Sequence, residues 1–280
     1  MEFQNDFRIK PGVGATVDWG CSISKGLIGC WLFNEKSGTW FKDIAGNNYG
    51  RGSPDLKFTG KGIVFPNLAS SITLPLNFMN FERTDKFTFF AVVNDIYNFT
   101  NTQTLFSRQQ ASNNTGIAIE IHNSSRAFRF AIFNDDSPSN FIEVRSSQLQ
   151  SGKRYSLMAT YNGSSGARGV NLYVNGVKDN ATISADTLTQ SIRTNTTPKI
   201  GNYAPTGTFP LKAYLDMAAV WRRELKQEEA QDMYINPYWF LYPNSIPIMT
   251  GEVASSALTF RKTLSPVGSR TGSRQTHGWN

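Results

Sequence analysis

The sequence predicts an all-β protein built as a sandwich or a barrel. Two observations lead to this fold class: short apolar runs follow one another with turn residues between them, and almost no stretch has the apolar spacing of a helix. The composition agrees, because 13% of the residues are aromatic and aromatic side chains favour strands. The candidate strands occur in this order: GLIGCWLF, GIVF, SITL, FTFFAVV, TLFSR, GIAIEIH, AFRFAIF, NFIEVR, RYSLMATY, VNLYVNG, KIGNY and AYLDMAAVW.

Size and charge exclude several classes of protein. A chain of 280 residues fits one large β domain with extensions as well as two small domains. The net charge is +7, from 28 basic and 21 acidic residues that are scattered, which argues against a nucleic-acid partner. No window holds the roughly 18 apolar residues of a membrane span, and the N-terminus lacks the apolar core of a signal peptide. We therefore expect a protein that is made in a cytoplasm and has no membrane span.

Two of the apolar runs predict a hairpin whose register can be tested. If residues 123–126 form a four-residue loop, the large apolar side chains of both strands share one face. The expected facing pairs are Ile121 with Phe128, Ile119 with Phe130, and Ile117 with Ile132. The same register places Glu120 opposite Arg129 on the other face.

The next two runs predict a half-buried strand and a tight turn. The residues from Tyr155 to Tyr161 alternate between a more apolar and a more polar side, which is typical of a strand with one buried face. In VNLYVNGVKD, Asn175 and Gly176 separate two apolar runs. Both residues tolerate the positive φ that a type I′ turn requires, so the sequence predicts a hairpin that turns there.

A single short helix is expected near the C-terminal end. The segment KQEEAQDMYI, residues 226–235, has helical character, and Pro237 ends it. No Ser, Thr or Asp cap precedes the segment, so the sequence leaves its first turn undefined.

Both ends of the chain differ in composition from the middle. Residues 1–25 contain Pro11, Gly12 and Gly14 without a strand pattern, and the last 38 residues are rich in Ser, Gly and Thr. We therefore expect an N-terminal arm at 1–25, a sandwich at 26–242 and a C-terminal arm at 243–280. The arm residues expected to contact neighbouring chains are Leu258, Phe260, Arg261 and Trp279.

Three blocks of sequence occur in an order that resembles a known family. They are GLIGCWLFNEKSGTWFKDIAGNNYG near the start, RYSLMATYNG followed by GVNLYVNGVKDNATI in the middle, and KIGNY with PLKAYLDMAAVWRRELKQEEAQDMYINPYWFLYP near the end. Over roughly residues 26–242 the chain resembles the laminin-G-like, concanavalin A-like lectin/glucanase family. The resemblance implies a concanavalin A-like jelly-roll β-sandwich, to which the residues add one short C-terminal helix and extended terminal arms.

The flanks of this region carry a second resemblance. YINPYWFLYP is similar to the Asn-Pro-Trp type of ending that follows this domain in many bacteriophage and prophage proteins, and KPGVGATVDWGCSISKGLIGCWLFNE resembles their lead-in. The resemblance implies a virion protein of the tail, a fibre or the capsid decoration. Its expected partners are other virion proteins bound through the arms, further copies of itself in a homo-oligomer, and glycans of the host cell surface. A purely architectural virion protein without a ligand stays open as an alternative, because fold does not fix function.

Catalysis needs separate attention, because the family includes glycoside hydrolases. Retaining enzymes need two carboxyl groups about 5–5.5 Å apart, and the Glu-x-Asp-x-Glu and Glu-x-Asp-x-x-Glu patterns of the glucanases do not occur here. Glu120 and His122 could form an acid/base pair, but we favour the pairing of Glu120 with Arg129. The chain also lacks phosphate-loop, zinc and nucleophile-elbow motifs. We therefore expect no catalytic residues and no enzyme; the alternative is a glycoside hydrolase or lyase whose carboxylates come from different strands.

Three acidic residues in predicted loops are candidate calcium ligands. Calcium takes six to eight hard oxygen ligands, and many domains of the resembled family bind it with loop carboxylates and carbonyls. Asp95 lies in VVNDIYNFTNT, and Asp135 and Asp136 lie in FNDDSPSN. Neither run matches a calcium motif of the family. The alternative is that these residues form turns by bonding their own backbone.

Aromatic residues in predicted loops are candidates for a glycan-binding surface. Glycan sites combine an aromatic platform with side chains that bond hydroxyl groups, although packing at an edge is the more common fate of loop aromatics. The predicted carbohydrate-binding residues are Trp40, Tyr49, Tyr97, Asn98 and Asn101. By contrast, Trp31 and Trp221 lie in predicted strands and are expected to pack inside.

Overall fold

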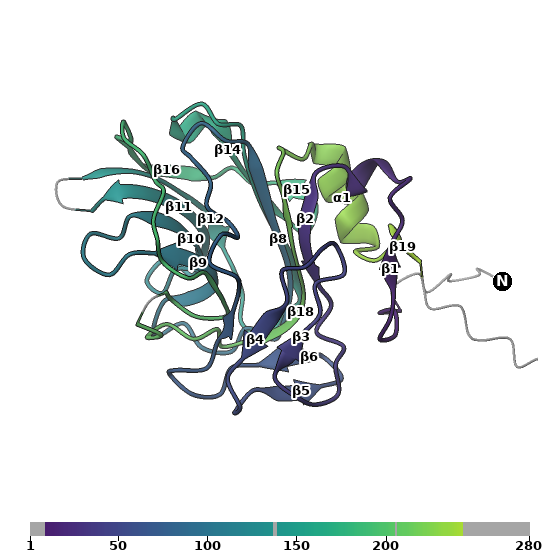
Figure 1. The fold of residues 1–280 in the computed structure, drawn as a ribbon. Helices are drawn as coiled ribbons and strands as arrows, with labels where there is room; N and C mark the ends of the chain where they lie inside the picture. Colours follow the sequence, from purple (N-terminus) through teal and green to yellow (C-terminus); the bar gives the residue numbers. More distant parts are fainter. Residues whose placement is uncertain (1–8, 137–138, 205, 243–280) are drawn as a thin grey trace, which may run out of the picture. The chain divides into compact units, whose positions relative to one another are not determined.

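The computed structural model describes residues 9–136, 139–204 and 206–242, which form a β-sandwich. Two antiparallel sheets lie face to face, and a third layer lies on the outer side of one of them (Figure 1). The predicted all-β jelly-roll sandwich with one short helix near the C-terminal end is confirmed. The predicted C-terminal arm, with Leu258, Phe260, Arg261 and Trp279, lies outside the described residues.

The first sheet has nine strands and contains the hairpin whose register the sequence predicts. In spatial order its strands are β16 (Thr182–Asp186), β12 (Asn140–Gln148), β11 (Ala127–Asp135), β10 (Gly116–Ile121), β9 (Gln103–Gln109), β17 (Lys199–Ile200), β7 (Ile72–Thr73), β4 (Gly50–Gly52) and β3 (Trp40–Phe41). The pairing of β10 with β11 has the expected register, because Ile121 faces Phe128 and Ile119 faces Phe130. The register prediction is therefore confirmed.

The second sheet has eight strands. In spatial order they are β15 (Val177–Lys178), β14 (Val170–Val174), β13 (Tyr155–Tyr161), β8 (Phe87–Asn94), β18 (Tyr214–Trp221), β6 (Gly62–Val64) and β5 (Lys57–Thr59), with β2 (Leu27–Trp31) also paired to β18. The central strands β8, β13 and β18 are buried along almost their whole length.

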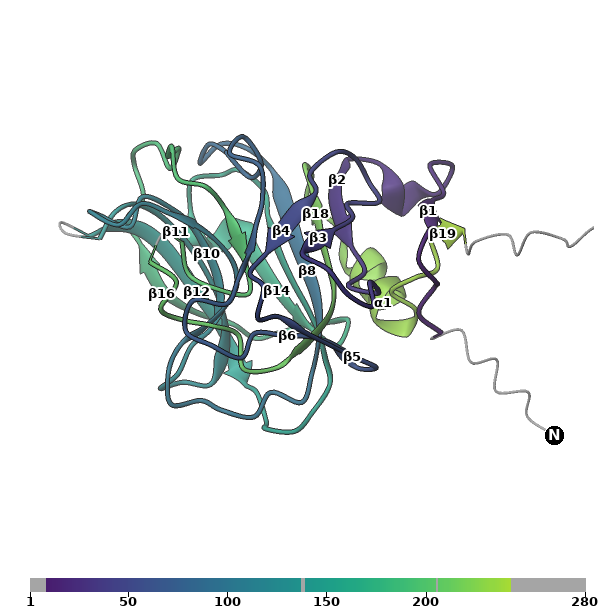
Figure 2. The ribbon, with the colours of Figure 1, turned by 60° about the horizontal axis from the view of Figure 1, so that its bottom comes forward.

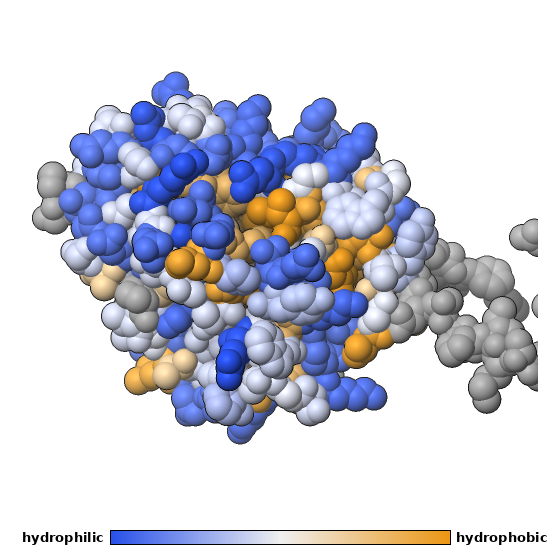
Figure 3. All heavy atoms as spheres, viewed as in Figure 1, coloured by the Kyte–Doolittle hydropathy of each residue, from blue (hydrophilic) through white to orange (hydrophobic). Residues whose placement is uncertain are grey.

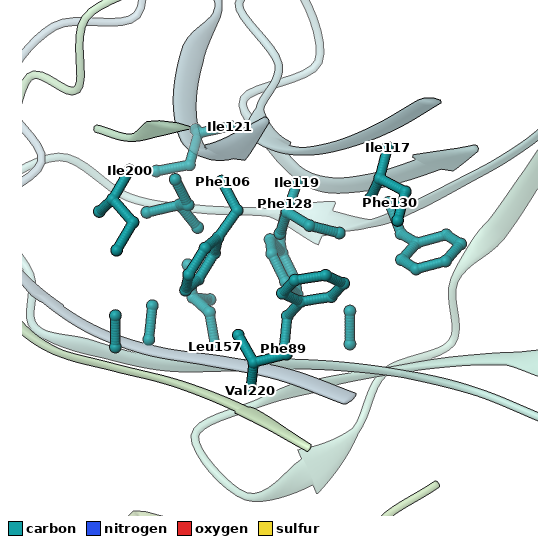
Figure 4. Close-up of a cluster of buried hydrophobic side chains, with 14 of the residues drawn as sticks. Phe89, Phe106, Ile117, Ile119, Ile121, Phe128, Phe130, Leu157, Ile200 and Val220 are labelled. Carbon is teal, nitrogen blue, oxygen red and sulfur yellow. The ribbon is translucent and has the colours of Figure 1, made fainter. Parts of the chain in front are cut away.

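The space between the two sheets is filled by aromatic and branched side chains. Figure 4 shows residues of both sheets, among them Phe89, Phe106 and Phe130, pointing toward one another. Seen from the side of Figure 1, hydrophobic residues reach the surface between the sheets, while hydrophilic residues cover most of the rest (Figure 3). Trp31 belongs to this inner core with no exposed surface, as predicted.

The outer face of the eight-stranded sheet is covered by a second layer, which we call the cap. The cap consists of residues 9–25 with β1 (Thr16–Val17) and a 3₁₀ turn (Ser22–Ser24), and residues 225–242 with α1 (Gln227–Ile235) and β19 (Leu241–Tyr242). Figure 2 shows α1, β1 and β19 on the side of this sheet that faces away from the nine-stranded sheet. The cap and the outer face of the sheet share one continuous apolar cluster.

The cap corrects one prediction and bears on another. β13 is buried on both faces, so the prediction of a half-buried strand is wrong, because the cap packs on the side that the sequence leaves more polar. Trp221 is fully buried as predicted, and its indole N–H donates to the carbonyl of Ile23 at 2.7 Å. The boundary between arm and sandwich at residue 26 stays a prediction, although Ile23 and Val17 are buried in the apolar cluster that the cap shares with the sheet, which we call the outer core.

The N-terminus of α1 is stabilised by a residue that the sequence pattern does not single out. The Glu229 carboxylate, in the first turn, accepts a hydrogen bond from the backbone N–H of the N-cap residue Lys226 at 2.9 Å, as the acidic residue of a capping box does. The same carboxylate pairs with the Arg223 guanidinium at 2.6 Å. α1 ends at Ile235, two residues before Pro237. In the described part of the chain, no helix is long and apolar enough to cross a membrane.

The predicted hairpin turn is present and lies against the helix. Asn175 and Gly176 have φ values of 53° and 75°, so both occupy the left-handed region that a type I′ turn requires. A Cβ atom at Gly176 would come within 2.8 Å of the Cβ atom of Tyr234 on α1. Gly176 therefore serves both the turn and the close packing of the hairpin on the helix.

Candidate functional site

The outer face of the nine-stranded sheet presents one continuous row of side chains. Strand pairing places in this row, from one edge toward the other, Trp40, Arg51, Thr73, Lys199, Ser107, Ala118, Ala131 and Glu143. Their neighbours along the strands, such as Phe41 and Ile200, point into the inner core. Because side chains alternate along a strand, the residues of the row face away from the core.

A cleft of about 250 Å³ lies on this face. The sheet contributes Glu120 from β10 and Arg129 and Phe133 from β11. The loop between β17 and β18 contributes Tyr203 and Phe209. The remaining lining residues are Thr102, Gln109, Asn114, His122 and Asp136. The cleft thus combines aromatic rings with a carboxylate, a guanidinium and amides.

The loop that carries Tyr203 and Phe209 is fixed onto the sheet by hydrogen bonds. The backbone N–H of Gly201 donates to the carbonyl of Leu105 at 3.0 Å, and the N–H of Thr104 donates to the carbonyl of Phe209 at 3.0 Å. The phenol of Tyr203 donates to the side-chain carbonyl of Asn114, and its ring meets that of Phe209 edge to face at 5.5 Å. The two rings are therefore held in place.

A chain of alternating charges begins in the cleft, at Glu120 and Arg129, and continues onto β12. Arg129 donates to Glu120 at 2.5 Å and to Glu143 at 2.7 Å, and Arg145 pairs with Glu143 at 2.6 Å. Burial pushes the pKa of Glu143 up, but the two arginines outweigh it, so this pKa lies below the usual value. The pairing of Glu120 with Arg129 is confirmed.

His122 lies at the cleft with its imidazole near two hydroxyl groups. The Nδ1 atom is 3.3 Å from the Ser124 Oγ and 3.2 Å from the Ser125 Oγ. Burial, together with the charges of Arg145 and Arg129, lowers the pKa of His122. The imidazole is therefore neutral at pH 7, and one of its nitrogens can accept a hydrogen bond from a hydroxyl group.

The residues predicted for glycan binding do not line the cleft. Trp40 lies in the edge strand β3 rather than in a loop, with 61% of its surface exposed and the Arg51 guanidinium 5.6 Å from its ring centre. Tyr49, just before β4, and Tyr97 are exposed. Asn98 and Asn101 line a small cavity of about 30 Å³ that shares Thr102 with the cleft. These five residues therefore stay candidates that flank the cleft or lie apart from it.

The three predicted calcium ligands are not brought together. Asp95 pairs with Lys61 at 2.6 Å beside a different cavity. Asp135 ends β11, and the next residue, Asp136, lines the cleft and accepts a hydrogen bond from the Asn114 side chain at 3.1 Å. Within residues 9–136, 139–204 and 206–242, no three His, Cys, Asp or Glu side chains are grouped so that they could hold a metal ion.

Sequence reasoning missed the two aromatic residues of the cleft, Tyr203 and Phe209. Both lie in GNYAPTGTFP, a segment rich in turn residues, where Tyr203 directly follows Asn202. Tyr97 is predicted on the same kind of signal, an aromatic residue next to an asparagine in a predicted loop. The signal was therefore present, but it does not tell which loop the fold places over the sheet.

Solved structures share this fold at low sequence identity. A sialidase of Trypanosoma rangeli in complex with sialic acid matches with a TM-score of 0.54 and 14% identity over 75% of this chain and 33% of the sialidase. The same enzyme with the inhibitor DANA gives a TM-score of 0.56 at 12% identity, over 76% of this chain and 33% of the sialidase. The binding domain of Paraclostridial Mosquitocidal Protein 1 gives 0.57 at 18% identity, over 76% and 52% of the two chains. This chain therefore spans about a third to a half of these structures.

These structures correct the prediction that the protein is not an enzyme. The solved structures that share the fold include sialidases as well as a binding domain, so the fold is common to enzymes and non-enzymes. The missing glucanase motif therefore does not exclude catalysis.

The family itself is established by the sequence match. None of the curated proteins matches the chain. Residues 68–231, more than half of the chain, match the profile of the concanavalin A-like lectin/glucanases superfamily. This match covers every residue of the cleft, and the first strands of both sheets, β2 to β6, precede it. The chain belongs to the concanavalin A-like lectin/glucanases superfamily.

Proposed function

We propose that the protein binds carbohydrate in the cleft on the outer face of the nine-stranded sheet. The observation that carries the proposal is the position of Tyr203 and Phe209, whose rings are held beside the Glu120–Arg129 ion pair. Aromatic rings pack against the C–H faces of sugars, while carboxylates, guanidinium groups and amides bond their hydroxyl groups. The volume of about 250 Å³ suits one or two sugar units rather than a long buried chain.

The wider role that we propose is attachment of a bacteriophage virion to glycans on its host. The support is the likeness of the flanking segments to phage proteins, including the ending YINPYWFLYP. In this role the terminal segments connect the sandwich to other virion proteins and to further copies of the chain. Deletion of residues 243–280 is then expected to leave the thermal unfolding of the sandwich unchanged and to abolish incorporation into particles, measured by antibody labelling of purified virions. Loss of folding, or unchanged incorporation, would count against this role.

Binding is tested by a glycan array and by titration calorimetry with the best glycan. Phe209→Ala removes one ring of the cleft, and we expect affinity to fall about 10- to 100-fold, because burial of an aromatic surface contributes about 1.5–3 kcal/mol. The matched controls are Tyr97→Ala and Trp40→Ala, which remove exposed aromatic residues outside the cleft.

The controls separate the cleft from the residues that the sequence selects. Unchanged affinity in Phe209→Ala with loss in a control would move the site to the flanking aromatics, and silence across the array and on host cells would refute glycan binding.

The array is repeated with a chelator, which shows whether calcium contributes. The same glycans are assayed for cleavage, with Glu120→Gln as the variant, since sialidases share the fold.

A further inference from the structure

A second cavity, larger than the cleft, lies where the cap meets the eight-stranded sheet. Its volume is about 460 Å³, and it shares no lining residue with the cleft. Its charged residues come from separate segments: Lys10 from the cap, Lys61 from the turn between β5 and β6, Asp95 from the position after β8, Arg154 from the position before β13, and Asp216 from β18. Three cationic and two acidic side chains leave one positive charge in excess.

One half of this cavity is a closed set of hydrogen bonds around Asp216. The carboxylate, in a residue only 9% exposed, accepts from the Lys10 ammonium at 2.7 Å and from the Tyr238 phenol at 2.8 Å. Lys10 also donates to the main-chain carbonyl of Asp216 at 2.8 Å. Burial raises the pKa of Tyr238 well above its usual value, so the phenol stays a donor. Asp216 is thus neutralised by its own neighbours.

The other half of the cavity has donors that the protein does not use. The closest carboxylate oxygen to the Arg154 guanidinium is the Asp216 Oδ2, at 3.8 Å, which is too long for a hydrogen bond. Within the described part of the chain this guanidinium makes no hydrogen bond, and its side chain is 37% exposed. Lys61 gives one of its three N–H groups to Asp95 at 2.6 Å and lies 5.6 Å from the ring centre of Tyr214.

We propose that this cavity binds an oxyanion, the carboxylate, sulfate or phosphate group of a ligand, with Arg154 as the principal contact and Lys61 as the second. A guanidinium presents parallel N–H groups that match the two oxygens of such an anion. The volume lies in the range of ordinary ligand sites. This site shares no residue with the cleft, so it binds its ligand independently.

Asp95 is the residue that limits the affinity of this site. Its carboxylate occupies Lys61 and adds a negative charge to the cavity. Its backbone has φ = 51°, a conformation that asparagine tolerates at least as well as aspartate. Asp95→Asn therefore frees Lys61 without straining the loop, and we expect it to strengthen anion binding severalfold.

The test is titration calorimetry of the full chain with inorganic phosphate, sulfate and glucuronate in separate experiments. We expect saturable binding of at least one probe, weakened about tenfold or more in Arg154→Gln and strengthened in Asp95→Asn. Lys57→Gln, which removes an exposed lysine of β5, is expected to change nothing. Binding of all three probes assigns a general oxyanion site, and binding of glucuronate alone assigns an acidic sugar.

Two results would overturn the proposal. One is the absence of saturable binding of any probe in the millimolar range to the wild type and to Asp95→Asn. The other is binding that persists at full strength in Arg154→Gln, which would place the anion elsewhere. Because Phe209→Ala reports on the cleft alone, failure of this site and failure of glycan binding in the cleft are distinguishable.

Discussion

Replacement of Arg129 by methionine is expected to lower the free energy of unfolding by about 3–5 kcal/mol at pH 7. Arg129 is the shared partner of Glu120 and Glu143, and both of these acidic residues are less than 5% exposed. The variant keeps the volume but leaves two buried carboxylates near each other without their common cation. Breaking a buried ion pair in this way costs far more than losing an exposed one.

The loss in Arg129→Met should depend on pH in a defined direction. In the wild type the pKa of Glu143 is lowered, so its contribution to stability is complete above its usual pKa and disappears as the pH falls through the lowered value. In the variant Glu143 loses the Arg129 charge that lowers its pKa, so the deficit of the variant against the wild type should shrink between pH 7 and pH 4. Urea unfolding at both pH values measures this change.

The control for this experiment is Arg126→Met. Arg126 lies in the loop that joins the same two strands, and its side chain is exposed over the Phe99 ring at 5.6 Å. We expect less than about 1 kcal/mol of change at either pH. Equal deficits of Arg129→Met at pH 7 and pH 4 would mean that lost packing, not unpaired charge, explains the effect.

Replacement of Arg108 by methionine is expected to cost about 3 kcal/mol or more, because three carbonyl groups, two of them buried, lose their donor. Arg108 is 2% exposed, and no carboxylate among the described residues pairs with it; its guanidinium donates to the carbonyls of Leu76, Phe78 and Thr194. Burial lowers its pKa to about 10. This cation therefore ties two loops to β9 through main-chain groups alone.

Arg108→Lys is the informative companion to this variant. A lysine keeps the charge, but its single ammonium group cannot span three carbonyls as a guanidinium does. We expect an intermediate loss in urea unfolding and increased amide exchange around residues 76–79. A neutral result for Arg108→Met would show that the burial cost of the guanidinium cancels its hydrogen bonds.

The parts of the fold that the sequence predicts correctly depend on residues that are neighbours along the chain. The β10–β11 register follows from the alternation of Ile119 and Ile121 against Phe128 and Phe130 across a short loop. The turn at Asn175 follows from the backbone preferences of two adjacent residues. In both cases neighbouring residues decide the geometry, and for the β10–β11 hairpin only one register buries the apolar face.

The parts that the sequence does not predict depend on contacts between distant segments. The polar side of β13 is buried because residues from both ends of the chain cover it, and no pattern within Tyr155–Tyr161 reports that cover. The sequence does not predict the cleft for the same reason, because Glu120 and Tyr203 are 83 positions apart in the chain. The sequence predicts a loop at Trp40 because a two-residue strand is too short to show alternation. The absence of a carboxylate motif within one strand likewise says nothing about groups that different strands supply.

The pairing of β1 with β19 determines how the cap responds to mechanical force. Thr16 pairs with Tyr242 and Val17 with Leu241, so the two chain ends leave the ladder at the same end. A pull on both ends therefore loads these hydrogen bonds one after another, as in a zipper, rather than all together in shear. The outer core would peel away from the sheet under tension before the inner core is strained. If the protein is tethered by both ends, the β1–β19 pair is therefore the first part to separate under load.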